Sequence, residues 1–200
     1  MTQPREAGVP TLDMGFGEAI ERLARINPRA PEEETPPSGR AAPFVKWAGG
    51  KRSVVKELVA RLPARLGHYW EPFAGGAALY FEIHDRLTAA TLSDTNFDLA
   101  VAFNAVKRDP QGLIGRLEQH ARRHGKTYYY KVRGQHDLQD PIDVAARFIY
   151  LNKTCYNGLY RVNRSGEFNV PMGSYVDPEI VNRDVILRCS AALQKADIRL

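Results

Sequence analysis

Apolar side chains recur at helical spacing in several parts of the chain. In residues 53–62 they repeat with a period near 3.6, and Pro63 ends the helix that this repeat predicts. Asp140 followed by Pro141 is typical of a helix start, because aspartate caps free N–H groups and proline fits the first turn. That predicted helix continues through residue 151. The same spacing predicts further helices over residues 77–81, 96–106, 113–124 and 183–195.

Short apolar runs between these helices predict strands. Residues 68–70, His-Tyr-Trp, are predicted to form a buried strand that leads into Gly75 and Gly76. Residues 89–92 predict a second strand that ends at Asp94, and residues 197–200 are expected to lead toward a further strand that is missing. A strand, a glycine turn and a helix in succession indicate an α/β fold with a Rossmann-like sheet, which we expect to be incomplete.

The first 42 residues differ in composition from the rest. They contain several prolines around the acidic run Glu32-Glu-Glu34, and such a segment buries too little apolar surface to order itself. We therefore expect a flexible leader over residues 1–42. Within it, a short amphipathic helix is predicted by the spacing of Phe16, Ile20, Leu23 and Ile26.

Turn residues frame a segment that follows the helix starting at residue 141. Asn157-Gly158 and Asn163-Arg-Ser-Gly166 are turn signals on either side of Leu-Tyr-Arg-Val, and they predict a β-hairpin. Donors and amides that suit base edges and phosphates in a DNA groove are Arg161, Asn163, Arg164 and Asn169. On composition alone, a solvated basic hairpin would be the better explanation of these side chains.

Length, charge and cysteine content narrow the classes of protein. A chain of 200 residues, 44% hydrophobic and 26% charged, suffices for one globular domain or one domain with a small insertion. The net charge of +5 favours a polyanionic partner such as nucleic acid. Cys155 and Cys189 lack the spacing of a disulfide framework or zinc site, and His120 and His124 lack an acidic neighbour. With no apolar run of membrane-spanning length and no signal peptide, we expect a cytoplasmic protein without bound metal.

Gly75 and Gly76 are candidates for a nucleoside site. A ligand can lie against backbone without side chains, and Asp94 follows about 20 residues later, where a carboxylate accepts from ribose hydroxyls. The ligand could be NAD, ATP or S-adenosylmethionine. No third glycine completes a dinucleotide fingerprint, and Arg52 stands where a phosphate loop has Ser or Thr. A sulfonium cofactor without phosphate suits the turn better.

Longer motifs resemble one family of enzymes. They are Phe44-Val-Lys-Trp-Ala-Gly-Gly-Lys51, Trp70-Glu-Pro-Phe-Ala-Gly-Gly76, Ser93-Asp-Thr-Asn96 and the block from Tyr150 to Pro171. In order and wording these motifs are similar to those of the Dam-type adenine-specific DNA methyltransferases. The resemblance runs from about Pro43 to Leu200. It implies a Rossmann-like methyltransferase sheet with a small helix-plus-hairpin insertion that recognises DNA.

The resemblance also implies site residues. S-adenosylmethionine would be bound by Trp47, Lys51, Glu71, Phe73, Gly75, Gly76 and Asp94. Double-stranded DNA would be contacted by Lys46, Asn157, Leu159, Arg161, Asn163, Asn169 and Pro171, with Arg161 reading a guanine. Ser174 departs from the basic residue of close relatives, which puts a phosphate contact in doubt. The implied divisions are a cofactor part (43–125), a target-recognition insertion (126–176) and a return to the core (177–200).

A catalytic motif of the family, Asp-Pro-Pro-Tyr, does not occur in the 200 residues. In the family its carboxylate and a backbone carbonyl accept the adenine amino hydrogens after the base is flipped from the duplex. We therefore expect a chain truncated before this motif, with no catalytic residue of its own and no methyl transfer. The second hypothesis is a non-catalytic fragment that binds DNA, the cofactor or a complementary C-terminal fragment. A weaker alternative is an unrelated nucleotide-binding oxidoreductase.

Overall fold

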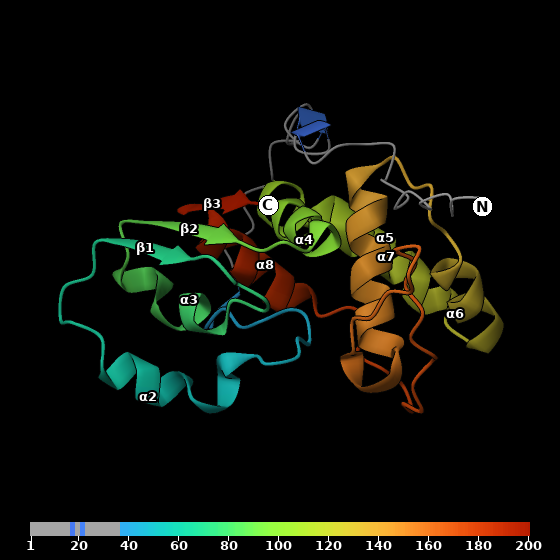
Figure 1. Cartoon of the computed structure of the whole chain (residues 1–200), viewed down its shortest axis with the longest axis horizontal. Helices are drawn as coiled ribbons and strands as arrows, with labels where there is room; N and C mark the ends of the chain where they lie inside the picture. Colours follow the sequence, from blue (N-terminus) through green and yellow to red (C-terminus); the bar gives the residue numbers. More distant parts are fainter. Residues whose placement is uncertain (1–16, 19–20, 23–36) are drawn as a thin grey trace, which may run out of the picture.

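A three-stranded parallel sheet forms one end of the protein in the computed structural model, which describes residues 17–18, 21–22 and 37–200 (Figure 1). The strands are β1 (His68–Glu71), β2 (Ala89–Ser93) and β3 (Ala196–Arg199), with β2 in the centre. The predicted strands at residues 68–70 and 89–92 are confirmed, but the expectation that residues 68–70 are buried is wrong: His68 and Trp70 are exposed, because no described helix covers their face of the sheet. The carboxyl ends of the strands meet at one edge of the sheet, next to the helical part of the molecule.

The last strand corrects an expectation. Residues 197–200 were expected to lead toward a missing strand, but Ala196–Arg199 is itself a strand that pairs with β2. Its alternating pattern is only four residues long, and Ala196 is buried while Asp197 is exposed. Such a short alternation becomes a strand because β2 supplies the hydrogen-bonding partner.

One face of the sheet is covered by helices. In Figure 1, α3 (Ala78–Ile83) and α8 (Arg183–Leu193) lie below the strands, and α2 (Val55–Ala60) lies beyond α3. Since side chains alternate along a strand, Glu71 shares the covered face with Leu92 of β2. Trp70 points to the other face and is 61% exposed. The sheet is therefore covered on one side by the described residues.

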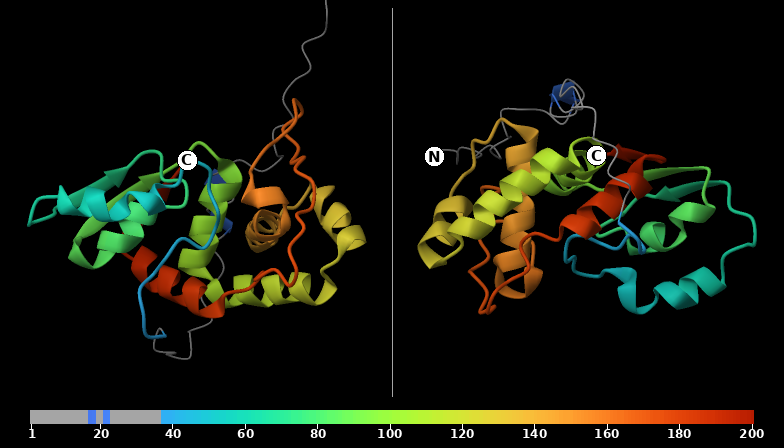
Figure 2. Two further views of the ribbon diagram at one scale, coloured as in Figure 1. Left: turned by 90° about the horizontal axis from the view of Figure 1, so that it is seen from below. Right: turned by 180° about the vertical axis from the view of Figure 1, so that it is seen from behind.

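The other end of the protein is a group of helices. Two further views show these helices on the opposite side of the molecule from the free end of the sheet (Figure 2). The helices are α4 (Phe97–Arg108), α5 (Pro110–Arg123), α6 (Lys126–Arg133) and α7 (Pro141–Thr154). Three of them begin with a side chain that caps the first turn. Asn96 Oδ1 accepts from Leu99 N, Asp109 Oδ1 accepts from Gly112 N, and Asp140 Oδ1 accepts from Ile142 N. The helix start predicted at Asp140 is confirmed.

Two apolar clusters hold these elements together. The larger joins the sheet, α3, α4, α5, α8 and the first half of α7. The smaller is formed by α6, the second half of α7 and the segment after it, around Tyr129, Tyr150 and Phe168. Tyr160 and Val181 pack against both clusters. The larger cluster thus joins the two ends of the protein, and α7 and the shared side chains join the two clusters.

The predicted β-hairpin is only partly formed, and we call residues 155–173 the arm. They contain a single turn of 3-10 helix (Tyr156–Gly158) and isolated antiparallel bridges, Cys155 with Met172 and Val162 with Phe168. The expectation of regular hairpin strands is therefore wrong. Asn157 and Gly158 have positive φ angles of 54° and 64°, and Pro171 has no N–H group, so a continuous ladder cannot run along the arm.

Part of the predicted leader packs on the fold. The backbone oxygen of Ser38 accepts from Arg188 Nη1 (3.2 Å), and that of Ala42 accepts from Cys189 Sγ (3.0 Å). These contacts anchor residues 38–42 on α8. The rest of the predicted leader, including the helix around Phe16 and Ile26, falls mostly outside the described residues.

Candidate functional site

A cavity of about 380 Å³ opens at the carboxyl ends of β1 and β2. Its walls are the loop from Pro43 to Arg52, the turn from Glu71 to Ala78, and Asp94. Every residue predicted to bind the cofactor lines this one cavity: Trp47, Lys51, Glu71, Phe73, Gly75, Gly76 and Asp94. Parallel strands place such residues together because successive loops leave the same edge of the sheet.

The two glycines of the turn differ in why they lack side chains. Gly75 has a φ of +50°, and a Cβ there would lie 2.6 Å from Cδ1 of Trp47. The fold itself therefore requires glycine at this position. A Cβ on Gly76 would meet only ordinary contacts, the nearest at 3.5 Å on Pro43. The packing of the protein therefore does not require glycine at position 76.

Asp94 holds the turn in place. Its Oδ2 accepts from Gly75 N (2.9 Å) and its Oδ1 accepts from Asn96 N (3.0 Å). The carboxylate therefore ties the glycine turn after β1 to the loop after β2. Each carboxylate oxygen can accept a further hydrogen bond, so these contacts leave capacity for a ligand hydroxyl.

Glu71 is a buried carboxylate at the floor of the cavity, only 6% exposed. Lys51 Nζ lies 3.9 Å from its Oε1, whereas Oε2 has no hydrogen-bond partner among the described residues. Burial raises the pKa of Glu71, and the Tyr69 hydroxyl, the charge of Lys51 and the backbone N–H of Tyr80 act in the opposite direction. An unpaired buried carboxylate oxygen is costly, so this floor suits a ligand that brings a cationic or hydrogen-donating group. The ammonium and sulfonium groups of S-adenosylmethionine fit that requirement.

The polar groups predicted to read DNA on the arm are engaged with one another. Arg161 Nε donates to Asn169 Oδ1 at 2.7 Å. Asn163 Oδ1 accepts from the backbone N–H groups of Ser165 and Glu167, both at 2.9 Å. Asn163 therefore stabilises the turn at the tip. Asn169 orients Arg161 through Nε and Nη2, and the other N–H groups of that guanidinium can still donate to a base.

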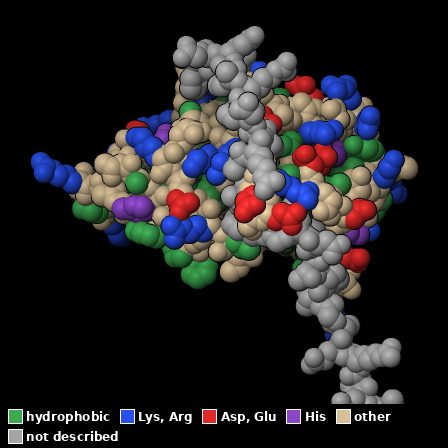
Figure 3. Space-filling model, turned by 90° about the horizontal axis from the view of Figure 1, so that it is seen from above, with side chains coloured by type: hydrophobic (Ala, Val, Ile, Leu, Met, Phe, Trp, Pro, Cys, Tyr) green, Lys and Arg blue, Asp and Glu red, His purple; other side chains and the backbone are tan. Residues whose placement is uncertain are grey.

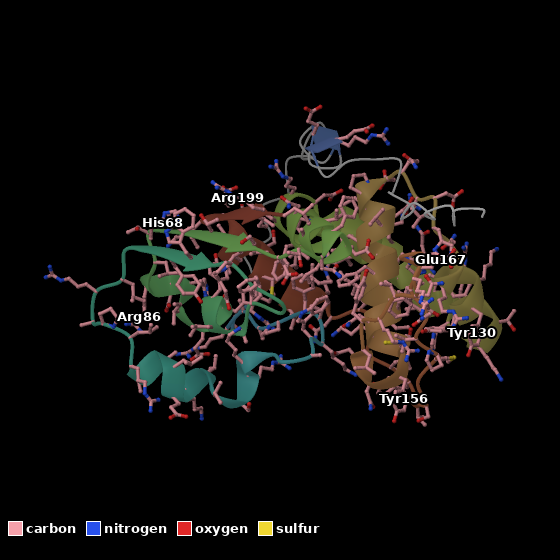
Figure 4. The ribbon with its side chains drawn as sticks, in the orientation of Figure 1. His68, Arg86, Tyr130, Tyr156, Glu167 and Arg199 are labelled. Carbon is pink, nitrogen blue, oxygen red and sulfur yellow. The ribbon has the colours of Figure 1, made fainter. Side chains whose placement is uncertain are left out.

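The apolar residues predicted to contact DNA are exposed on the arm. Leu159 is 40% exposed, and Asn157 and Pro171 are exposed as well. Figure 4 places Tyr156 below the end of α7 and Glu167 higher on the same side, so the arm runs alongside that helix. Basic and acidic side chains are interspersed on the face seen from above, so charge alone does not mark a DNA-binding surface there (Figure 3).

Lys46 stands between the cavity and the arm. Its Nζ donates to the hydroxyl of Tyr175 at 3.0 Å, and the ammonium lies 4.2 Å from the centre of that ring. The side chain of Asn152 bridges the backbone N–H and C=O of Lys46, both at 2.8 Å. A Cβ on Gly158 would clash with the Lys46 side chain. The loop that lines the cavity and the start of the arm are therefore packed directly together.

Several residues at this junction were not predicted. Asn152 is buried and also donates to the backbone oxygen of Gly158 at 3.1 Å. Tyr160 packs against Trp47, with ring centres 5.6 Å apart. Arg52 and Ala48 line the cavity. No spacing rule identifies them, because their partners are distant in the sequence.

Comparison with known proteins agrees with these motifs. Residues 47–200 match the family described as D12 class N6 adenine-specific DNA methyltransferase. Type II methyltransferase M1.LlaDCHI of Lactococcus lactis subsp. cremoris is 37% identical over 163 residues, which cover 79% of this chain and 57% of that protein. Type II methyltransferase M.MjaIII of Methanocaldococcus jannaschii is 38% identical over 177 residues (78% and 60%). A DNA adenine methylase of Haemophilus influenzae is 33% identical over 151 residues (74% and 52%).

The match has a defined extent. The chain spans between about half and three fifths of the length of these relatives. None of the helices in residues 37–200 is long and apolar enough to cross a membrane. No group of three or more His, Cys, Asp or Glu side chains that could hold a metal occurs among the described residues. The matched segment contains the arm and all the residues that line the cavity except Pro43 and Val45, and the chain belongs to the D12 class N6 adenine-specific DNA methyltransferase family.

Proposed function

We propose that this chain binds S-adenosylmethionine in the cavity and double-stranded DNA along the arm. It would be the cofactor-binding and DNA-reading part of an enzyme that methylates the 6-amino group of adenine. The observation that carries the proposal is the cavity itself. It gathers every residue expected to bind the cofactor, and its floor holds a carboxylate oxygen that has no hydrogen-bond partner in the described part of the chain.

The residues of the cavity suggest distinct roles. Asp94 would accept from the ribose hydroxyls while it holds the glycine turn. Glu71 would face a cationic part of the cofactor, and Gly76 would let the ligand approach the backbone. Trp47 and Phe73 would provide apolar walls. The bound cofactor supplies an electrophilic methyl group, and the chain's own part is to bind and orient it.

The DNA-binding role of the arm rests on its chemistry and its place. Gly158 and Tyr160 of the arm pack against Lys46 and Trp47 of the loop that lines the cavity, so a base held by the arm would be near the cofactor. Arg161 would read a guanine through its Nη groups while Asn169 holds its Nε. Residues 126–176 would form the recognition insertion, and residues 43–125 and 177–200 the methyltransferase core. Since two relatives are Type II methyltransferases, we include a restriction-modification role in the proposal.

We further propose that residues 1–200 alone do not transfer the methyl group. Asp-Pro-Pro-Tyr does not occur among them, and two of the Asp-Pro pairs have other tasks, because Asp109 and Asp140 cap helices. Preorganised acceptors at a reacting centre are worth on the order of 100-fold or more in rate. A complementary C-terminal polypeptide would supply them, and the sheet face around His68, which the described residues leave uncovered, offers it a surface (Figure 4).

The transfer of labelled methyl from S-adenosylmethionine to unmethylated duplex DNA tests this part. We expect no turnover by residues 1–200, and turnover by a form extended through Asp-Pro-Pro-Tyr. Turnover by the 200-residue form would show that another residue orients the adenine, and our assignment of the active site would be wrong.

The cofactor site is tested by Asp94→Ala, with Asp109→Ala as matched control. Both variants remove an aspartate that caps backbone N–H groups, but only Asp94 lines the cavity. By calorimetry, we expect Asp94→Ala to lose S-adenosylmethionine binding and Asp109→Ala to keep it, at similar costs in stability of about 1 kcal/mol. Full affinity in a folded Asp94→Ala protein would remove the ribose role.

A further inference from the structure

Tyr160 lies where the cavity and the arm meet. It belongs to the arm, between Leu159 and Arg161. Its ring centre is 5.6 Å from that of Trp47 at an interplanar angle of 31°, and 5.8 Å from those of Phe148 and Phe168. It is one of the two side chains that pack against both apolar clusters. Its ring is therefore held by the cavity wall, by α7 and by the opposite side of the arm.

The hydroxyl of Tyr160 is fixed as well. It donates to Asp98 Oδ2 at 3.1 Å. Asp98 lies in the first turn of α4, just after the loop in which Asp94 holds the glycine turn. Burial raises the pKa of Asp98, and the charge of Arg147 and the Tyr160 hydrogen bond oppose that rise. The hydroxyl thus ties the arm to the helix that begins at the rim of the cavity.

Trp47 is shared between the two regions. It lines the cavity, and it lies so close to Gly75 that no Cβ fits there. It also packs against Tyr160. A ligand in the cavity would restrict the motion of Trp47, and the restriction would pass to Tyr160 through direct contact.

We propose that Tyr160 is a positioning residue that couples occupation of the cavity to the order of the arm. With the cofactor bound, Trp47 and Asp98 hold Tyr160, and the neighbouring Leu159 and Arg161 are held in the position in which they meet DNA. The arm can respond because its two sides are paired by isolated bridges and a few backbone hydrogen bonds, without regular strands, and its tip is exposed. Such coupling is reciprocal, so DNA would strengthen cofactor binding by the same factor. The inference rests on the proposed cofactor site.

Hydrogen exchange of peptides spanning residues 159–170 tests the inference, with and without S-adenosylhomocysteine. The variants are Tyr160→Phe, which keeps the ring, and Tyr160→Leu, which removes it. The matched control is Tyr156→Phe, an exposed tyrosine of the same arm. We expect the ligand to slow exchange several-fold in the wild type and in Tyr156→Phe. The slowing should be smaller in Tyr160→Phe and absent in Tyr160→Leu.

The difference between bound and free states is the decisive quantity. A merely structural Tyr160 would raise exchange equally with and without ligand, and that result would overturn the inference. Calorimetry on the same samples separates the two proposals. Ligand binding without slowed exchange in the wild type overturns the coupling and leaves the cofactor site intact, whereas no binding removes both. If Tyr160→Leu does not fold, the inference is judged on Tyr160→Phe. If the ligand slows exchange in that variant as much as in the wild type, the proposed role of the hydroxyl is wrong.

Discussion

The cavity and the arm differ in how their polar groups are hydrogen-bonded. In the cavity, Gly75 N donates a hydrogen bond to Asp94, and one buried oxygen of Glu71 has no hydrogen-bond partner among the described residues. In the arm, Arg161 and Asn163 are already hydrogen-bonded within the arm. The cavity is therefore preformed, and the arm holds its polar groups in internal contacts.

This difference has an energetic consequence. A preformed site binds without first breaking contacts, so most of its interaction energy appears as affinity. In the arm, Asn163 must exchange its contacts with Glu167 and the backbone of the turn for a base contact, and only the difference between the two appears as binding energy. An arm of this kind discriminates between sequences, because a wrong base leaves it in its internal state. We therefore expect the cavity to determine the affinity for the cofactor and the arm to determine the specificity for the DNA sequence.

The strongest way to break the comparison is Gly75→Ala. The new Cβ meets Trp47 at 2.6 Å on a backbone with positive φ, so we expect a loss of about 1–3 kcal/mol in the free energy of unfolding. S-adenosylmethionine binding should fall below detection. Gly76→Ala is the control, since its Cβ has room and the stability should change by less than about 0.5 kcal/mol. Chemical denaturation and calorimetry give both quantities.

Gly76→Ala also has an outcome of its own. If the cofactor lies against this backbone, the methyl group occupies its space, and affinity should fall by about tenfold or more while the fold stays intact. Full affinity in Gly76→Ala would show that the ligand does not approach this wall.

The arm is tested by Arg161→Ala. If Arg161 donates two bonds to a guanine, binding to the preferred duplex should weaken by about 1–3 kcal/mol, with a smaller loss on random duplex. Arg164→Ala, at an exposed arginine of the same turn, is the control and should weaken both duplexes alike. Fluorescence anisotropy with the two duplexes at one salt concentration measures this. Equal losses in Arg161→Ala would make it a phosphate contact.

The smallest expected effect is the change in the free energy of unfolding at acidic pH. His120 lies in α5 and packs against Tyr128 and Tyr150, and burial and the charges of Arg123 and Arg116 lower its pKa to about 4. The unfolded chain then binds the proton more readily, so this contribution to stability is complete above pH 6.5 and is lost as pH falls toward 4. We expect a loss on the order of 1 kcal/mol between pH 7 and 5, since His120 is partly exposed.

The matched variant for this effect is His120→Asn, which cannot titrate. Its free energy of unfolding should vary less between pH 7 and 5 than that of the wild type, as measured by urea denaturation. Glu71 has the opposite sign, because a raised carboxyl pKa lets the folded state take up the proton first. A pH dependence identical in His120→Asn and the wild type would contradict the assignment to His120.

Local signals in the sequence determined much of this protein. The cap at Asp140, the strand at residues 68–70 and the glycine turn all appear where the sequence predicted them. Each depends on residues within a few positions of one another. The start of α5 at Pro110 was missed, although Asp109 and Pro110 carry the same signal as Asp140 and Pro141. The family followed from the motifs, because their wording is far more specific than their spacing.

Only the tertiary structure decided the rest. Four residues at the end of the chain form β3 because β2 lies beside them, and the arm lacks regular strands because positive φ angles and Pro171 interrupt its ladder. The bond of Tyr160 to Asp98 joins residues 62 positions apart, and the bridge of Asn152 to Lys46 joins residues 106 apart. Periodicity reports which face of an element is buried, but the partner on that face is chosen by packing between distant segments.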